Sequence, residues 1–164
     1  MMKYCKETTK GHLVSRQNPT CIESLTTIIE NEGGKGKAKL FLAEQVVLNL
    51  DKVVRCKKMA TPISSMDITF GVEEGKKKKM VLVDFKFNQN SPYNFDKDTL
   101  EKKVSDSKDL LGAETEIKNE YYIIVPQGIK EQSRYYFDKI FRSNKGKPNF
   151  SPILIDELKD LFFQ

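Results

Sequence analysis

Two apolar runs separated by a short charged segment dominate the middle of this 164-residue chain. The first run spans 63–72, the second spans 80–87, and the segment between them contains two acids, one glycine and four lysines. Runs rich in β-branched and aromatic residues on either side of a polar, glycine-containing turn are typical of a β-hairpin. We therefore expect two antiparallel strands with the lysines at the tip, and a fold built around a sheet.

The rest of the chain alternates helix-like and strand-like segments. Apolar spacing, helix-forming residues and end signals predict helices over 20–32, 38–49, 96–111, 131–141 and 156–163. In the helix 96–111, the buried stripe is expected to contain Leu100, Val104, Ser107 and Leu111. Further extended segments are predicted over 53–56, 121–126 and 152–155. This order predicts an α/β (α+β) fold with a central mixed β-sheet of about four strands flanked by helices.

Length and composition favour one domain with a sizeable core. We expect an N-terminal helical extension over 1–37, a core over 38–127 and a C-terminal helical part over 128–164. The net charge of +5 suits an anionic partner such as nucleic acid, although many basic proteins bind nothing in particular. No apolar run could span a bilayer and no secretion signal is recognisable, so we expect a cytoplasmic protein with no membrane partner. One histidine and three scattered cysteines argue against a disulfide framework or a zinc site.

The ends of the two predicted strands carry the residues of chemical interest. Pairing of the runs brings Asp67 toward Asp84, and strand alternation places Lys86 on the same face as Asp84 and Phe85 on the opposite face. Two carboxylates beside an ammonium group can hold a divalent cation next to a phosphate. The alternative is an ordinary surface salt bridge. Because both faces of the second strand are apolar up to Asp84, the sequence favours a site.

Glu44 lies in the middle of the predicted helix 38–49, which is apolar around most of its circumference. A buried carboxylate is costly unless it is paired or binds a cation. We therefore expect Glu44 to join the aspartates, and the hydrolytic hypothesis requires that it does. The alternative is that Glu44 faces outward beside Lys37 or Lys39.

These acids and the lysine, in their order and spacing, resemble the PD-(D/E)XK nuclease superfamily, also called restriction-endonuclease-like. In that family, an acid on the first core helix precedes an acid on the second strand, and the third strand carries an acid, any residue and a lysine. The matching positions here are Glu44, Asp67 and Asp84-Phe85-Lys86. The resemblance covers about 38–127, and Met66 stands where the family often has proline.

The resemblance implies a restriction-endonuclease-like fold and a metal-dependent phosphodiesterase that acts on nucleic acid, DNA in the first place. It implies that Mg²⁺ or Mn²⁺ is bound by Glu44, Asp67, Asp84 and the main-chain carbonyl of Phe85. Lys86 would orient the attacking water or stabilise the negative charge that grows on the phosphate.

Four further residues are candidates for nucleic-acid binding. Asn88 and Gln89 follow Lys86 closely, and Lys102 and Lys103 on the next predicted helix could line a substrate groove. Each of them could equally be an ordinary surface residue.

Two other hypotheses remain open. The chain could keep the nuclease fold but act as a catalytically inactive binding or interaction module, or it could be a small structural protein with acids placed by chance. The presence of all four groups favours an enzyme over a decayed copy. Because little sequence lies outside the core, sequence-specific cleavage would require a homodimer or a protein partner.

Overall fold

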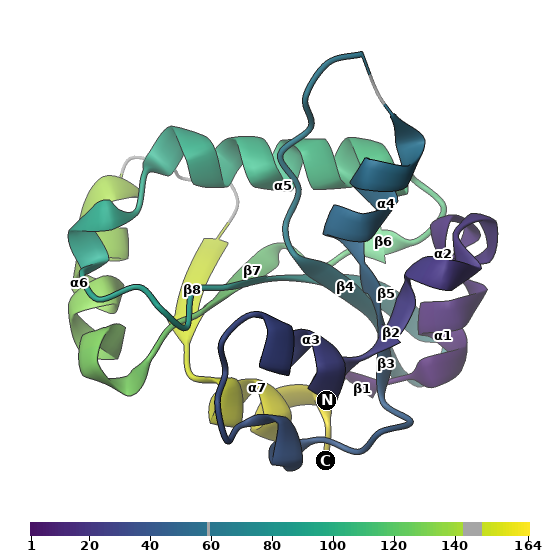
Figure 1. The fold of residues 1–164 in the computed structure, drawn as a ribbon, viewed down its shortest axis with the longest axis horizontal. Coiled ribbons are helices and arrows are strands. Elements are labelled where there is room, and N and C mark those ends of the chain that lie inside the picture. Colours follow the sequence, from purple (N-terminus) through teal and green to yellow (C-terminus); the bar gives the residue numbers. More distant parts are fainter. Residues whose placement is uncertain (59, 143–148) are drawn as a thin grey trace.

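A computed structural model describes residues 1–58, 60–142 and 149–164. Within these ranges, an eight-stranded mixed sheet has the order β2-β3-β4-β5-β7-β8, with β1 beside β4 and β6 beside β5 (Figure 1). The strands are β1 (Lys3–Tyr4), β2 (Ile22–Ser24), β3 (Val46–Asn49), β4 (Ile68–Glu74), β5 (Lys77–Phe85), β6 (Glu116–Ile117), β7 (Glu120–Ile124) and β8 (Asn149–Ile153). The helices are α1 (Lys6–Gly11), α2 (Leu13–Gln17), α3 (Leu25–Asn31), α4 (Leu50–Lys57), α5 (Lys97–Leu111), α6 (Lys130–Ile140) and α7 (Ile155–Phe162).

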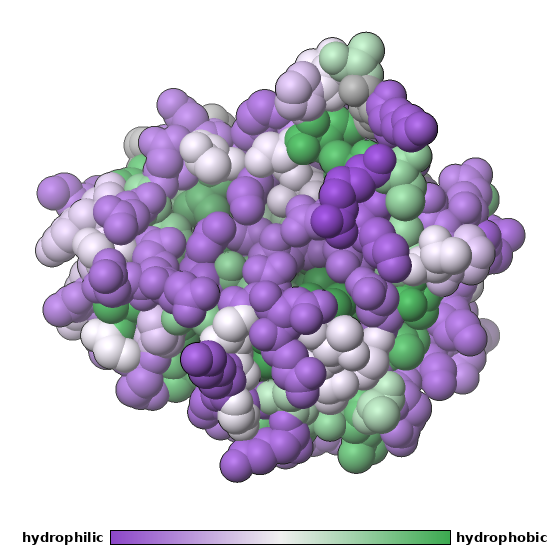
Figure 2. All heavy atoms as spheres, viewed as in Figure 1, coloured by the Kyte–Doolittle hydropathy of each residue, from purple (hydrophilic) through white to green (hydrophobic). Residues whose placement is uncertain are grey.

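Helices cover both faces of the sheet, which gives the molecule two apolar cores (Figure 1). One core joins the sheet to α2, α4, α5 and α6, and it includes Leu82 and Val104. The other joins the sheet to α3 and α7, and it includes Val83 and Phe162. On the face seen in Figure 2, hydrophilic residues predominate and apolar residues emerge in small groups. None of the described helices is long and apolar enough to cross a lipid bilayer.

The predicted hairpin is confirmed as β4 and β5, which pair antiparallel from Ile68 opposite Val83 to Glu74 opposite Lys77. Gly75 turns the chain at the tip with a φ of 61°, a left-handed conformation that glycine adopts without steric cost. Residues 80–85 of β5 are all buried, since helices cover both faces of the strand. β5 then pairs with β7, and β7 with β8, in parallel, so these three strands end at the same side of the sheet.

The sheet is larger than the four strands expected from the sequence. The additional strands β1, β2 and β6 have only two or three residues, too few to produce an alternating pattern. The first 37 residues therefore contribute strands as well as helices. Residues 20–24, expected to begin a helix, instead form a short 3₁₀ turn and β2, and α3 starts at Leu25.

Two element predictions between 38 and 57 are wrong. The expected helix 38–49 is a 3₁₀ turn, an irregular segment and β3, because Val46 to Asn49 pair with strands on both sides. This tertiary pairing outweighs the local helix propensity. The expected strand 53–56 lies in α4, whose N-cap is Asn49; its side chain accepts a hydrogen bond from the N–H of Lys52.

The N-terminal segment is joined tightly to the hairpin at Gly71. The N–H of Cys5 donates to the Gly71 carbonyl, and the Gly71 N–H donates to the hydroxyl of Thr9. A Cβ atom at Gly71 would lie 2.4 Å from the side chain of Thr8. Only glycine lets α1 approach β4 this closely.

β8 is the last strand in the sheet order, and it contains a proline. The carbonyl of Ile153 accepts a hydrogen bond from Val125, so the main-chain groups of Ile153 face β7. Main-chain groups of successive strand residues point to opposite sides, which directs those of Pro152 away from β7. Pro152 has no N–H, so the outer side of β8 lacks a donor at this position.

Candidate metal centre

The base of the hairpin brings Asp67 and Asp84 side by side, as the strand pairing predicted. Asp67 directly precedes β4, and its N–H donates to the carbonyl of Val83 at 3.1 Å. This bond joins Asp67 to Val83, the residue of β5 that is paired with Ile68, so Asp67 lies near Asp84, the next residue of β5. Phe85 packs in the core formed with α3 and α7, on the opposite face from Leu82, as strand alternation predicted.

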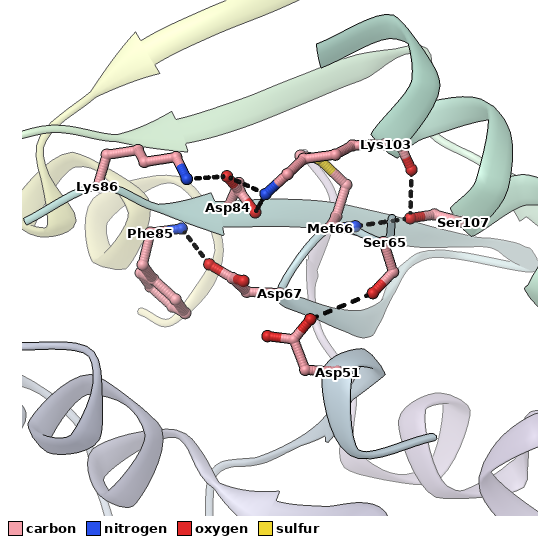
Figure 3. A network of polar contacts seen from close by, with 9 residues as sticks. All are labelled: Asp51, Ser65, Met66, Asp67, Asp84, Phe85, Lys86, Lys103 and Ser107. Atoms are coloured by element: carbon pink, nitrogen blue, oxygen red, sulfur yellow. Dashed lines mark hydrogen bonds and ion pairs between the residues drawn. The ribbon is translucent and has the colours of Figure 1, made fainter. Parts of the chain in front are cut away.

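Asp84 is fully buried and is held by two lysines (Figure 3). Lys103 of α5 places its Nζ 3.1 Å from both carboxylate oxygens of Asp84. Lys86, which follows β5, places its Nζ 3.2 Å from Oδ2 of Asp84. A buried carboxylate needs such partners because its charge has lost the stabilisation that water provides.

Asp67 lies in a different electrostatic environment, since no lysine contact to its carboxylate is present among the described residues. Its Oδ2 accepts a hydrogen bond from the N–H of Phe85 at 2.7 Å (Figure 3). Burial, and next the charge of Asp84, raise the pKa of Asp67 to about 9. Asp51 and Glu32 act in the same direction. In the metal-free protein at neutral pH, Asp67 therefore holds a proton.

Asp67 is also one of three acids that converge from three different elements. One carboxylate oxygen each of Glu32, Asp51 and Asp67 lies within 4.8 Å of the other two. Glu32 caps the C-terminus of α3, and Asp51 lies in the first turn of α4. All three residues are partly buried, and the Ser65 hydroxyl donates to Asp51 at 3.3 Å. Burial, then the charges of Asp51 and Asp84, raise the pKa of Glu32.

This set of donors fits a hard divalent cation. Mg²⁺ and Mn²⁺ prefer oxygen ligands, and Mg²⁺ commonly keeps several waters beside one or two carboxylates. A bound cation would also favour the ionised forms of Glu32 and Asp67, which burial first and nearby acids second disfavour. The donors are thus sufficient in chemistry and number for a metal ion.

The expectation for Glu44 is wrong. Glu44 lies in the irregular segment before β3, where its side chain is exposed to solvent. The predicted helix that would have carried it toward the aspartates does not form, because the chain turns there to enter the sheet. The hydrolytic hypothesis that depended on Glu44 therefore fails in that form, and the acids near Asp67 are Glu32 and Asp51 instead.

Sequence reasoning missed Glu32 and Asp51 for identifiable reasons. Glu32 ends α3 just before Gly33-Gly34, so its direction depends on how α3 packs against the sheet. Asp51 was assigned to no element, although Asn49-Leu50-Asp51 has the form of a helix start, with a capping residue and an acid in the first turn. That capping signal could have placed Asp51 in the first turn of a helix, although not beside Asp67.

The candidates for nucleic-acid contacts lie in different settings. Asn88 is exposed, and Gln89 is partly buried, with its side-chain amide donating to the carbonyl of Ser91. Lys102 forms an ion pair with Asp106 on the same helix. Lys103 does not face solvent as a groove residue would; its ammonium group points at Asp84 (Figure 3).

Comparisons with protein-family models, with curated proteins and with solved structures find no match to this chain. Any assignment of function therefore depends on the residues of the site and on their arrangement.

Proposed function

We propose that this protein is a metal-dependent nuclease that hydrolyses phosphodiester bonds in nucleic acid, with DNA as its substrate. The observation that carries the proposal is the convergence of Glu32, Asp51 and Asp67 beside the Asp84–Lys86 pair. Carboxylates supply the metal ligands, and the neighbouring lysine supplies a positive charge for the phosphate. The net charge of +5 favours an anionic substrate.

The order of the elements supports the resemblance to the PD-(D/E)XK superfamily in a corrected form. A helix that ends in an acid, α3 with Glu32, precedes the hairpin. An acid then lies at the start of β4, and an acid, a hydrophobic residue and a lysine lie at the end of β5. Glu32 thus takes the helical position for which the sequence suggested Glu44, and we propose a restriction-endonuclease-like core on this basis.

In the proposed reaction, Glu32, Asp51 and Asp67 would hold a Mg²⁺ or Mn²⁺ ion, and Asp84 lies near them. The ion, when bound, polarises a phosphoryl oxygen and makes a coordinated water more acidic. Asp67 would release its proton to solvent on binding the ion, because a carboxylate must be ionised to act as a ligand. Lys86 has a side chain 32% exposed, so its ammonium can reach a phosphate while Asp84 fixes its direction.

The test compares the two glutamates that compete for the helical position. We expect Glu32→Gln to weaken Mn²⁺ binding about 10-fold or more, because a charged ligand is lost. Glu44→Gln is the matched control, and it should leave binding and cleavage unchanged since Glu44 faces solvent. Metal binding is measured by the rise in melting temperature on titration with Mn²⁺. Cleavage is measured with supercoiled plasmid and with single-stranded DNA as substrates.

Three outcomes would count against the proposal. If the wild-type protein shows no stabilisation by Mg²⁺ or Mn²⁺, the acids do not form a metal centre. If the protein binds DNA equally well without metal and never cleaves it, the binding-module hypothesis is favoured. If Glu44→Gln abolishes cleavage while Glu32→Gln does not, the acids have been assigned incorrectly.

A further inference from the structure

The ammonium group of Lys103 lies where a cation would have to approach Asp84. Lys103 comes from α5, its side chain is only 16% exposed, and its Nζ contacts both oxygens of Asp84. Asp84 itself has no exposed surface. Lys103 and Lys86 are therefore the cationic partners of this carboxylate among the described residues.

The main chain of Lys103 is fixed, whereas its side chain is a flexible chain of four carbons. The hydroxyl of Ser107 donates to the Lys103 carbonyl, and the same hydroxyl accepts from the N–H of Met66, next to Asp67. Figure 3 shows this connection between α5 and the base of the hairpin. The ammonium can thus leave Asp84 by rotation of side-chain bonds, with α5 remaining in place.

Several acids surround the ammonium group of Lys103, as they would surround a bound metal ion. Asp84 contacts this ammonium directly, and Asp67 and Asp51 lie close enough for their ionised forms to raise its pKa. Burial acts to lower the pKa of Lys103, but the nearby acids outweigh burial, so the pKa is raised and the amine remains charged. Lys86 differs because its Nζ lies slightly farther from Asp84, at 3.2 Å, and its side chain is twice as exposed.

We propose that Lys103 is a built-in counter-cation that occupies Asp84 in the metal-free protein and competes with the divalent ion for this carboxylate. The inference rests on the proposed metal centre and adds a step to it: metal binding displaces the Lys103 ammonium from Asp84. Displacement completes the ligand set with a fourth acid. It also frees a second lysine, beside Lys86, for the substrate phosphate.

Competition has a consequence that a purely structural ion pair does not have. Two cations that exclude each other from one carboxylate are negatively coupled, so removal of one must tighten binding of the other. In addition, Asp84 without Lys103 has only Lys86 to balance its buried charge, and the metal-free fold should lose stability. Metal binding should therefore rescue a Lys103 variant more strongly than it stabilises the wild type.

The first experiment measures this coupling with Lys103→Met, which matches the length of the lysine's carbon chain and removes the ammonium group. We expect a lower melting temperature without metal, a larger rise on adding Mn²⁺, and about 10-fold tighter Mn²⁺ binding than in the wild type. Lys97→Met is the control, because Lys97 is also on α5 and is paired with an acid, Glu101, away from Asp84. It should show the wild-type response to Mn²⁺.

The second experiment uses the wild-type chain and does not depend on the folding of any variant. Lysine acylation followed by mass spectrometry reports how accessible each amine is. We expect Lys103 to be protected without metal and to react faster when Mn²⁺ is bound, while Lys97 reacts equally in both states.

The outcomes separate this inference from the proposed function. If Mn²⁺ stabilises the wild type and Lys103→Met to the same extent, or if Lys103 stays protected with Mn²⁺ bound, the metal centre stands and the role of Lys103 is overturned. If Mn²⁺ has no effect on the wild type, the metal centre fails and the displacement of Lys103 fails with it.

Discussion

The two ends of the β4–β5 hairpin contain the same kinds of residue in opposite environments. At the tip, Lys79 pairs with Glu116 of β6 at 2.8 Å, and the Glu116 side chain is 67% exposed. At the base, Lys103 pairs with Asp84 at the longer distance of 3.1 Å, and Asp84 is fully buried. Judged by distance alone, the tip would have the stronger pair.

Burial makes the pair at the base the stronger one, despite its longer distance. Water and salt screen an exposed pair, which commonly contributes no more than about 1 kcal/mol to stability. A buried pair interacts in a medium of lower effective dielectric, and removal of one partner leaves an uncompensated charge. The same residue types thus form a solvated surface at one end of the hairpin and a reactive cluster at the other.

The two ends also lie too far apart to act on the same phosphate. β4 has seven residues, about 23 Å at the usual rise per residue. The lysine run Lys76 to Lys79 belongs to the tip, so it cannot assist Lys86 at the base. Its charge can act only on more distant parts of a long anionic ligand.

The largest expected effect is at the base of the hairpin. Asp84→Ala leaves Lys103 and Lys86 without their shared partner, and we expect a loss of about 3 kcal/mol in the free energy of unfolding. Stabilisation by Mn²⁺ and cleavage of DNA should also disappear. Urea denaturation measures the first effect, and a loss no larger than that at the tip would show that burial does not separate the two ends.

The next effect is a pH dependence that only the base should show. The pKa of Asp67 is raised in the folded chain, so the folded state holds a proton that the unfolded state has released. Between about pH 4 and pH 9, stability should therefore fall as pH rises, by at most about 1.4 kcal/mol per pH unit. Asp67→Asn cannot ionise and should lack this slope.

The slope of stability against pH is measured by denaturing the wild type and Asp67→Asn in metal-free buffer over this pH range. Parallel stability curves for the wild type and Asp67→Asn would contradict the raised pKa. Because a bound cation favours the ionised carboxylate, Mn²⁺ should flatten the wild-type slope and leave that of Asp67→Asn unchanged.

The smallest effect is expected at the tip. Glu116→Ala removes the acid that pairs with Lys79 at the tip, and we expect a change within about 0.5 kcal/mol in the free energy of unfolding. Its response to Mn²⁺ should equal that of the wild type. A loss of several kcal/mol would mean that exposed pairs in this hairpin contribute as much as the buried one.

Local patterns in the sequence were sufficient to predict the hairpin and the pair of aspartates. β5 is apolar on both faces and its charges begin abruptly at Asp84, which is what a buried strand that ends at a site requires. The stripe predicted for 96–111 is also confirmed, since Leu100, Val104, Ser107 and Leu111 are all buried. Lys103 lies three residues after Leu100 and four before Ser107, so helical spacing already placed it on that buried face.

The sequence-based predictions that failed concern features that depend on tertiary contacts. Residues 38–49 have good helix propensity, but Val46 to Asn49 fill a gap between β2 and β4, and sheet pairing decided the outcome. Glu44 lost its expected role for that reason. The proximity of Glu32 and Asp51 to Asp67 arises from the packing of α3 and α4 against the end of the sheet, which no short-range pattern encodes.

Pro152 has a consequence for how copies of this chain can associate. An unprotected strand at the margin of a sheet invites a strand from another molecule, and that is how many proteins begin to aggregate or to form fibres. Here one margin lacks a donor at Pro152, and the other is β2, only three residues long. Neither margin of the described sheet offers a continuous template, which disfavours edge-to-edge addition of further copies.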